Sequence, residues 1–274
     1  MSKKGHDANS GAVAFESFYG ALFGDRWPAL RAALLSPVSH LAWAEGLLKA
    51  YYLDAGSVQA ALSLPLTENG RALDMCAAPG GKSLIIASRL SPESTLVSNE
   101  YSRDRKNRLI SVLDQHLPPE TRSKVTVTGR DASRWSRYEQ SAFDAILLDA
   151  PCSSERHVLS APQYLAEWSG ARIRNLAQRQ WSLLSGAWLV LKPGGYLLYS
   201  TCALAPAEND GVVERLAKKY DDVEIVSASD GNDGAAIVPS FAKAEPTRFG
   251  KHVLPDTSDG SGPLYYALAR KKEA

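Results

Sequence analysis

The chain has 274 residues, a formal net charge of +1 and 45% hydrophobic residues, which is enough for a sizeable core in one large or two small domains. No apolar run reaches the roughly 18 residues of a membrane helix, the polar start lacks the apolar core of a signal peptide, and the three widely spaced cysteines argue against a disulfide framework or a zinc motif. The balanced charge excludes strong non-specific attraction to nucleic acid, so any such contact has to be local or assisted by a partner.

The first 65 residues differ in pattern from the rest. Residues 1–10 are polar without periodicity, and we expect a disordered tail. Over 11–65 apolar residues recur at spacings of three and four, with breaks at Pro28 and Pro37, which predicts a small helical N-terminal region packed on the main domain.

Residues 66–274 read as one α/β domain, because short apolar segments alternate there with helical patterns. We expect strands near 71–75, 94–99, 123–128, 143–149, 195–200 and 222–227, helices near 81–90, 102–116, 171–191 and 207–219, and a last strand over 263–270. The loop 229–261 fits no assignment. A parallel sheet of this kind binds ligands beyond the carboxyl ends of its strands, which is where Asp74, Glu100, Asp131 and Asp149 fall.

The stretch 71–83 predicts a strand, a tight loop and a helix. Gly80 and Gly81 let the backbone approach a ligand closely, and the N–H groups at the start of the helix are free, so a nucleotide-like cofactor is the expected occupant. Neither the Gly-x-Gly-x-x-Gly dinucleotide motif nor a phosphate loop is present, because Cys76 stands where the latter needs its first glycine.

Two carboxylates after the next strands have two interpretations each. Glu100 can accept hydrogen bonds from the hydroxyls of a ribose, or it can neighbour the start of the following helix, and the glycine loop upstream favours ribose. Asp131 can reach an adenine amino group, or it can be a turn aspartate.

Two cysteines stand at the ends of two further strands. Asp149 and Cys152 follow the fourth strand and Cys202 follows the fifth, so in a sheet whose first strand neighbours the fourth, and the fourth the fifth, both thiols open onto one cleft. Free cysteine is often a buried core residue, but two at this place are more than coincidence suggests. A thiolate can add to carbon 6 of cytosine, which makes carbon 5 nucleophilic towards a methylsulfonium group, and a carboxyl group can hold the ring nitrogen and amine. The residues therefore suit cytosine-5 methylation of an unpaired base.

Three motifs carry a resemblance to a known family. Asp-Met-Cys-Ala-Ala-Pro-Gly-Gly-Lys-Ser at 74–83, Asp-Ala-Pro-Cys at 149–152 and Ser-Thr-Cys at 200–202 resemble the Nop/Sun-domain family of RNA cytosine-5 methyltransferases, over most of 15–270. Segments at 23–31, 154–157 and 262–266 are similar to the subgroup that includes the mitochondrial ribosomal-RNA enzyme. The resemblance implies a Rossmann-like S-adenosylmethionine-dependent methyltransferase fold with a small helical N-terminal extension.

The resemblance also implies roles for individual residues. Cys202 matches the nucleophile, Cys152 the cysteine that assists product release, and Asp149 the carboxylate between cofactor and cytosine. The positions that match the binding site for S-adenosylmethionine are Cys76, Ala77, Ala78, Pro79, Gly80, Gly81, Lys82, Glu100, Arg105, Asp131, Ala132 and Asp149. Glu100 replaces a usual Asp and Ala132 a common Gly, which bears on fine cofactor geometry more than on activity. No residue is expected to bind a metal.

The implied substrate is ribosomal RNA, with transfer RNA as the alternative, and no membrane is involved. No added RNA-binding domain is visible, so targeting is expected to depend on a protein partner or an assembling ribosomal particle. Arginines and lysines over 103–108 and 172–179 can contact phosphate, or they can form solvated helix faces. A mitochondrial location follows from the resemblance, and the cytoplasm is the alternative, because no Arg-rich presequence is visible. Two rivals stay open: a DNA cytosine methyltransferase, against which the Thr201-Cys202 pair argues, and an rRNA-binding assembly factor whose catalysis is dispensable.

Overall fold

The computed structural model describes residues 10–38, 40–226 and 241–273. The N-terminal part contains α1 (Ser10–Phe23), η1 (Gly24–Arg26), α2 (Trp27–Leu35), β1 (His40–Trp43), β2 (Tyr51–Asp54) and α3 (Ala55–Leu62). The middle contains β3 (Arg71–Asp74), α4 (Gly81–Ser88), β4 (Thr95–Asn99), α5 (Arg103–His116), α6 (Pro119–Ser123), β5 (Val125–Thr128), η2 (Ala132–Arg137) and β6 (Phe143–Asp149). The rest contains α7 (Glu155–Ser160), α8 (Pro162–Ala166), α9 (Gly170–Val190), β7 (Leu191–Thr201), η3 (Pro206–Glu208), α10 (Asp210–Lys219), β8 (Val223–Val226), β9 (Ala244–Pro246), β10 (Lys251–Val253) and β11 (Leu264–Lys271).

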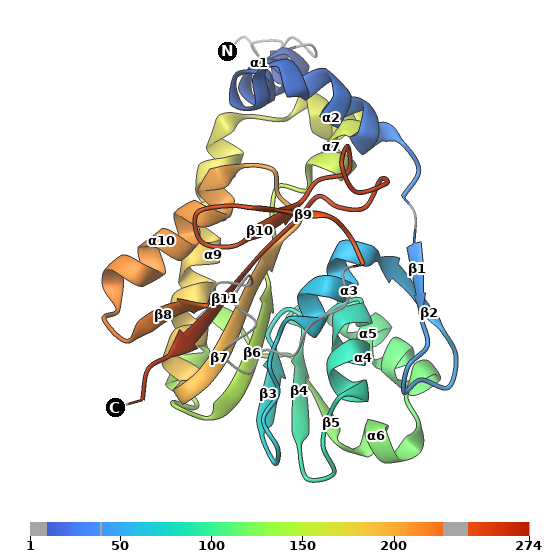
Figure 1. The fold of residues 1–274 in the computed structure, drawn as a ribbon, viewed down its shortest axis with the longest axis vertical. Coiled ribbons are helices and arrows are strands. Elements are labelled where there is room, and N and C mark those ends of the chain that lie inside the picture. Colours follow the sequence, from blue (N-terminus) through green and yellow to red (C-terminus); the bar gives the residue numbers. More distant parts are fainter. Residues whose placement is uncertain (1–9, 39, 227–240, 274) are drawn as a thin grey trace, which may run out of the picture.

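In the described residues, nine strands form one sheet in the order β5-β4-β3-β6-β7-β11-β10-β9, and β8 pairs with β11 (Figure 1). The strands β5, β4, β3, β6 and β7 are parallel, and β11 runs antiparallel to β7. The predicted parallel core is confirmed, including the order in which β3 neighbours β6 and β6 neighbours β7. As a result, the loops after Asp74, Asp149 and Thr201 lie side by side at one edge of the sheet.

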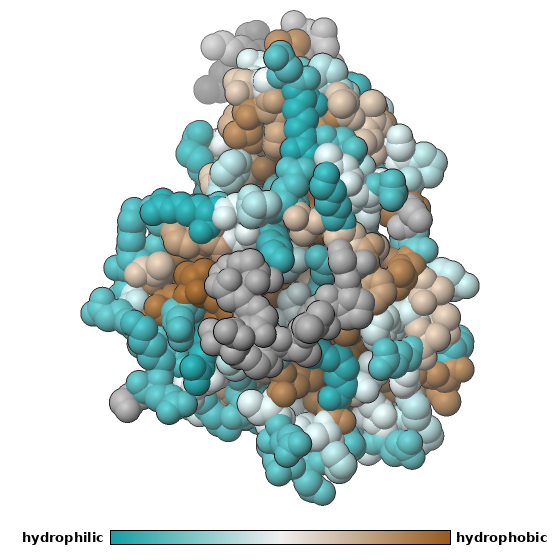
Figure 2. All heavy atoms as spheres, viewed as in Figure 1, coloured by the Kyte–Doolittle hydropathy of each residue, from teal (hydrophilic) through white to brown (hydrophobic). Residues whose placement is uncertain are grey.

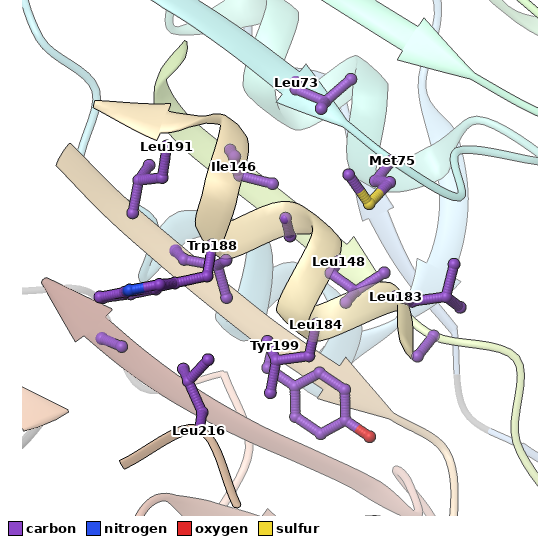
Figure 3. Packing of buried hydrophobic residues seen from close by; sticks show 14 of the residues in the cluster. Leu73, Met75, Ile146, Leu148, Leu183, Leu184, Trp188, Leu191, Tyr199 and Leu216 are labelled. Atoms are coloured by element: carbon purple, nitrogen blue, oxygen red, sulfur yellow. The ribbon is translucent and has the colours of Figure 1, made fainter. Parts of the chain in front are cut away.

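Helices cover both faces of the sheet. Successive side chains of its buried strands point to opposite faces, and apolar side chains on each face need a covering layer. In β6, Ile146 and Leu148 point to one face and belong to a core that includes Trp188 of α9 (Figure 3). Ala145 and Leu147 point to the other face, where they pack with residues of α3, α4 and α5. Because both faces of β6 are buried, the side chains that point to either face are apolar, and residues 145–148 form a continuous apolar run in the sequence.

The N-terminal region is partly different from the prediction. Residues 11–65 do contain α1, α2 and α3, but His40–Trp43 and Tyr51–Asp54 form a two-stranded antiparallel sheet that a wholly helical region does not include. Trp43 of β1 and Leu53 of β2 are buried against α3 and α4, and this packing stabilises the two strands. The predicted tail 1–10 lies outside the described residues except for Ser10, which begins α1.

The helices α1 and α2 lie together at one end of the molecule, over α7 (Figure 1). The buried side of this pair includes Phe15, Tyr19 and Trp27, which pack with Trp168 and with Leu204 after β7. The outer side leaves some large apolar side chains exposed, and hydrophobic surface is visible at this end of the molecule (Figure 2). In the described residues, no helix combines the length and apolar character needed to cross a bilayer.

The loop 229–261 that fitted no assignment is partly described. Residues 227–240 lie outside the description, and residues 241–261 contain the short strands β9 and β10 that extend the sheet beyond β11. The predicted last strand over 263–270 corresponds to β11, and it lies between β7 and β10.

Candidate active site

A cavity of about 1130 Å³ opens at the carboxyl ends of the parallel strands. Residues from the loops after β3, β4, β5, β6 and β7 all contribute to its wall. Of the predicted site residues, those that line it are Cys76, Ala78, Lys82, Glu100, Arg105, Asp131, Ala132, Asp149, Cys152 and Cys202. Ala77, Pro79, Gly80 and Gly81 are not among the lining residues.

The two glycines of the cofactor loop face protein atoms. Gly80 has a φ of 123°, and a Cβ atom on it would lie 3.0 Å from Val112 and 3.2 Å from Leu109 of α5. A Cβ atom on Gly81 would lie 2.9 Å from the ring of Tyr51 in β2. In this structure the two glycines allow the loop to pack against α5 and the β1–β2 sheet, and the close approach of their backbone to a ligand stays a prediction.

Asn99 holds the cofactor loop in place, and the sequence analysis missed it. Its buried side chain donates hydrogen bonds to the carbonyls of Met75 (3.1 Å) and Arg130 (3.0 Å), and accepts bonds of 2.8 Å from Thr128 Oγ1 and from the N–H of Arg130. One amide thus joins the loops after β3, β4 and β5. The available signal was the position of Asn99 at the carboxyl end of β4, directly before Glu100.

Glu100 makes the predicted contact with the start of the following helix and also lines the cavity, where ribose binding stays a prediction. The residue is only 5% exposed, and its Oε1 accepts a hydrogen bond of 2.9 Å from the N–H of Ser102 at the start of α5. Its Oε2 lies 3.3 Å from Arg105 Nη1, and Arg105 Nη2 donates to the carbonyl of Ala78 at 2.8 Å. Each carboxylate oxygen keeps further acceptor capacity on the cavity side.

For Asp131 the turn interpretation is observed, and contact with an adenine stays a prediction. It lines the cavity, and it is a turn aspartate, because Oδ1 accepts hydrogen bonds from the hydroxyl (2.7 Å) and the N–H (3.0 Å) of Ser133. These bonds, above all the one from the hydroxyl, hold the pKa of Asp131 below its usual value. Asp131 is therefore ionised at neutral pH.

Asp149 is fixed from two sides at the end of β6. Its Oδ2 accepts a bond of 2.8 Å from Lys82 Nζ, and its Oδ1 accepts one of 2.8 Å from Ser200 Oγ in β7. Burial lowers the pKa of Lys82, but the charge of Asp149 and the hydrogen bond to it outweigh this effect, and the net pKa is raised. The loop lysine is thus a cation that orients a carboxylate at the cavity wall.

The thiols of Cys152 and Cys202 face each other in the cavity, with their Sγ atoms 2.8 Å apart. Ser154, for which no role was predicted from the sequence, places Oγ 3.3 Å from Cys202 Sγ and 3.6 Å from Cys152 Sγ. Hydrogen bonds from the Cys152 thiol and the Ser154 hydroxyl lower the pKa of Cys202, against the effect of burial. The pKa of Cys152 is raised because its thiol is hydrogen-bonded to Cys202 and because it is buried. The site therefore favours a thiolate on Cys202.

The predicted basic residues lie on α5 and α9, beside the cavity. Arg105 and Arg179 line it, and both are exposed. Arg103 and Arg108 on α5, with Arg172 and Arg174 on α9, are exposed as well. Exposure leaves both interpretations of these side chains available, as phosphate contacts or as solvated faces.

The residues present fit S-adenosylmethionine. The cavity is larger than the roughly 300–1,000 Å³ usual for a small-molecule site, which leaves room for a nucleoside cofactor and a base together. Glu100 offers unused acceptor capacity at the end of β4, and Asp131 with Ala132 stands beyond β5. The fold and the donor set define the class of Rossmann-like, S-adenosylmethionine-dependent methyltransferases.

Comparison with known proteins identifies the family within that class. Residues 61–269 match the family model described as 16S rRNA methyltransferase RsmB/F, and the chain belongs to this family. The resemblance to the Nop/Sun-domain RNA cytosine-5 methyltransferases is thereby confirmed.

Individual relatives agree with this membership. The chain is 36% identical over 230 residues to the mitochondrial tRNA (cytosine(34)-C(5))-methyltransferase of Danio rerio, covering 82% of this chain and 62% of the relative. It is 31% identical over 229 residues to the 5-cytosine rRNA methyltransferase NSUN4 of Mus musculus, covering 81% and 60%. The chain thus spans less than two thirds of the length of either relative. A methyltransferase homolog protein from Pyrococcus horikoshii shares the fold, with a TM-score of 0.71, 21% identity and coverage of 99% of this chain and 100% of that one.

Proposed function

We propose that this protein methylates carbon 5 of cytosine in RNA through a covalent Cys202–cytosine intermediate. The observation that carries the proposal is the pair of thiols, 2.8 Å apart at the ends of adjacent parallel strands, beside a carboxylate in the cofactor cavity. Membership of the RsmB/F family supports the same reaction.

Cys202 is the nucleophile in this proposal. Its thiolate adds to carbon 6 of the target cytosine, and carbon 5 becomes nucleophilic as a result. The hydrogen bonds from Cys152 and Ser154 favour that thiolate at neutral pH, where an ordinary thiol of pKa about 8.5 is mostly protonated. After methyl transfer, the proton on carbon 5 passes to Cys152 or to a base near it. The electrons of that C–H bond re-form the C5–C6 double bond as the C6–S bond breaks, which returns Cys202 as a thiolate.

Asp149 orients the base. Lys82 and Ser200 each occupy one of its oxygens, and the remaining lone pairs can accept a hydrogen bond from the exocyclic amine of cytosine, and from N3 when that nitrogen is protonated. A carboxylate fixed at this place sets the orientation of the base, and the ammonium group of Lys82 beside it offsets the negative charge that thiolate addition puts on the ring. When bound, S-adenosylmethionine supplies the electrophilic methyl group. Glu100 would hold its ribose, Asp131 and Ala132 its adenine, and the loop 76–82 its amino-acid end.

Ribosomal RNA is the proposed substrate class, with transfer RNA as the second candidate. The family description names 16S rRNA and the Mus musculus relative is an rRNA enzyme, whereas the Danio rerio relative acts on tRNA. The mitochondrial label of the Danio rerio enzyme supports a mitochondrial location, with the cytoplasm as the alternative. Targeting by a protein partner or a ribosomal particle completes the proposal.

Bisulfite sequencing of total RNA, from cells with and without the protein, tests the function and separates the substrates. We expect one or a few cytosines in ribosomal RNA to lose methylation when the protein is absent and to regain it with the wild type but not with Cys202→Ala. Sites in tRNA alone would select the second candidate. Unchanged methylation in both RNA classes, with ribosome assembly rescued by Cys202→Ala, would favour an assembly factor. Full site-specific turnover of naked RNA by the isolated chain would exclude a required partner.

A further inference from the structure

Behind the two thiols lies a buried carboxyl group without an obvious role in the reaction. Glu155, the first residue of α7, has 0% exposure. Its hydrogen-bond partners in the described residues are two hydroxyls and one backbone N–H, so no cation is among them. Burial raises its pKa despite these bonds. Burying an acidic group without a cation costs free energy of folding, so its presence next to two reactive cysteines calls for an explanation.

The partners of Glu155 come from three separate parts of the chain. Its Oε1 accepts a bond of 2.5 Å from Tyr19 Oη on α1 and a second bond from the hydroxyl of Ser153, the neighbour of Cys152. Its Oε2 accepts a bond of 3.0 Å from the N–H of Leu204, two residues after Cys202. One carboxyl group therefore joins both cysteine loops to the N-terminal helix.

A second buried carboxyl group supports the Cys152 loop from the other side. Glu208 Oε2 accepts bonds from the N–H of Ser153 (3.0 Å) and from Gln180 Nε2 (2.7 Å), and Gln180 Nε2 also donates to the carbonyl of Pro151 at 3.0 Å. The backbone on both sides of Cys152 is thus held to α9 and η3. Glu208 thus ties this loop to η3, further along the chain from Cys202, whereas Glu155 ties it to Leu204, two residues after Cys202, and to α1.

We propose that Glu155 is a positioning residue, which sets the distance and orientation between the Cys152 and Cys202 thiols and makes α1 part of the frame of the active site. This inference rests on the proposed function for the roles of the two thiols. The hydrogen bond between the sulfurs, and with it the difference in acidity between them, depends on this distance.

Two substitutions of Glu155 separate its acceptor role from its charge. Glu155→Met keeps a similar volume but leaves the Tyr19, Ser153 and Leu204 donors without an acceptor. In Glu155→Gln the amide oxygen can still accept from the N–H of Leu204. The NH₂ group can donate to the hydroxyls of Tyr19 and Ser153, because a hydroxyl group can turn and act as an acceptor. Leu216→Ala on α10 is the matched control, since it removes buried side-chain volume in the main core and none of the hydrogen bonds of Glu155. Tyr19→Phe, which keeps the packed ring, tests the same link if Glu155→Met does not fold.

The first measurement is the pH dependence of alkylation of each cysteine by iodoacetamide in the isolated chain, followed by peptide mass spectrometry. In the wild type, Glu155→Gln and Leu216→Ala, we expect Cys202 to react at lower pH than Cys152. In Glu155→Met and Tyr19→Phe this difference should narrow, and kcat for methyl transfer should fall about 10- to 100-fold in Glu155→Met with little change in the KM for S-adenosylmethionine.

The inference would be overturned if the pH values at which Cys202 and Cys152 are alkylated stayed as far apart in the folded Glu155→Met or Tyr19→Phe variants as in the wild type. An equal narrowing of this difference, or an equal loss of kcat, in Leu216→Ala would overturn it as well. Alkylation requires no RNA. Absence of methyl transfer by the wild type would therefore refute the proposed function alone, while the alkylation profiles would still decide whether Glu155 positions the thiols.

Discussion

Replacing Glu100 with Gln should weaken the binding of S-adenosylmethionine with little effect on the fold. In the structure, the ion pair with Arg105 is long at 3.3 Å and the arginine side chain is 55% exposed, so it contributes little to stability. The carboxylate can accept from both ribose hydroxyls, and charge-assisted hydrogen bonds contribute about 1.5–3 kcal/mol each. An amide keeps one acceptor oxygen, so about one such bond is lost, which corresponds to a roughly 10- to 100-fold increase in Kd.

Isothermal titration calorimetry with S-adenosylmethionine measures this change. Glu120→Gln on α6 is the control, because this residue has a similar charge and is exposed outside the cavity lining. The melting temperatures of both variants should stay close to that of the wild type. A Kd for Glu100→Gln equal to that of the control would refute the assignment of the ribose site to the end of β4.

Three further predictions concern the same region. Asp149→Asn should reduce kcat for methyl transfer by about 10²- to 10³-fold, with a smaller change in cofactor Kd, because it removes the charge that orients the base. The rate is measured with a radiolabelled methyl donor, and an unaltered rate would exclude Asp149 from that role. Gly80→Ala should lower the free energy of unfolding by about 1–3 kcal/mol in urea titrations, because the φ of 123° and the 3.0 Å approach to Val112 disfavour a Cβ atom; equal stability would show that the loop relaxes freely. Burial raises the pKa of Glu208 to about 7 in the folded protein, so its stabilising contribution is present below its unfolded value near 4.5 and is lost as the pH rises through 7. The wild type should therefore lose about 1–3 kcal/mol of stability relative to Glu208→Gln between pH 5 and pH 8, and parallel pH profiles would contradict this.

The parallel core of the sheet was predictable because its signals are local. In β6, five of the seven residues are apolar, four of them in an unbroken run, and the helical patterns on either side leave few arrangements other than a doubly covered sheet. The strands β1 and β2 were missed because four-residue strands carry little periodicity, and the packing of Trp43 and Leu53 on α3 and α4 decides their conformation. The helix α9 ends at Val190, within one residue of the prediction. The strand β7 begins at Leu191, earlier than predicted, because Pro193, Gly194 and Gly195 look like a break in the sequence and yet belong to an irregular stretch of strand.

The site was predictable where chemistry-bearing residues follow strands, as with Asp149, Cys152 and Cys202. The residues that hold them were not predictable in the same way. Glu155 is hydrogen-bonded to Tyr19, which is 136 positions earlier in the chain, and Asn99 is hydrogen-bonded to backbone groups of two other loops. Such contacts arise from the tertiary arrangement and leave no spacing pattern in the sequence.

The most direct test of the central claim is to look for a covalent protein–RNA adduct in the presence of S-adenosylmethionine. We expect Cys152→Ala to accumulate an adduct that resists denaturing gel electrophoresis, because Cys202 can still add to cytosine while release is impaired. The wild type, Cys202→Ala and the double variant should show none at steady state. An adduct that persists in the double variant, or that forms with Cys202→Ala instead of Cys152→Ala, would contradict the assignment of Cys202 as the nucleophile.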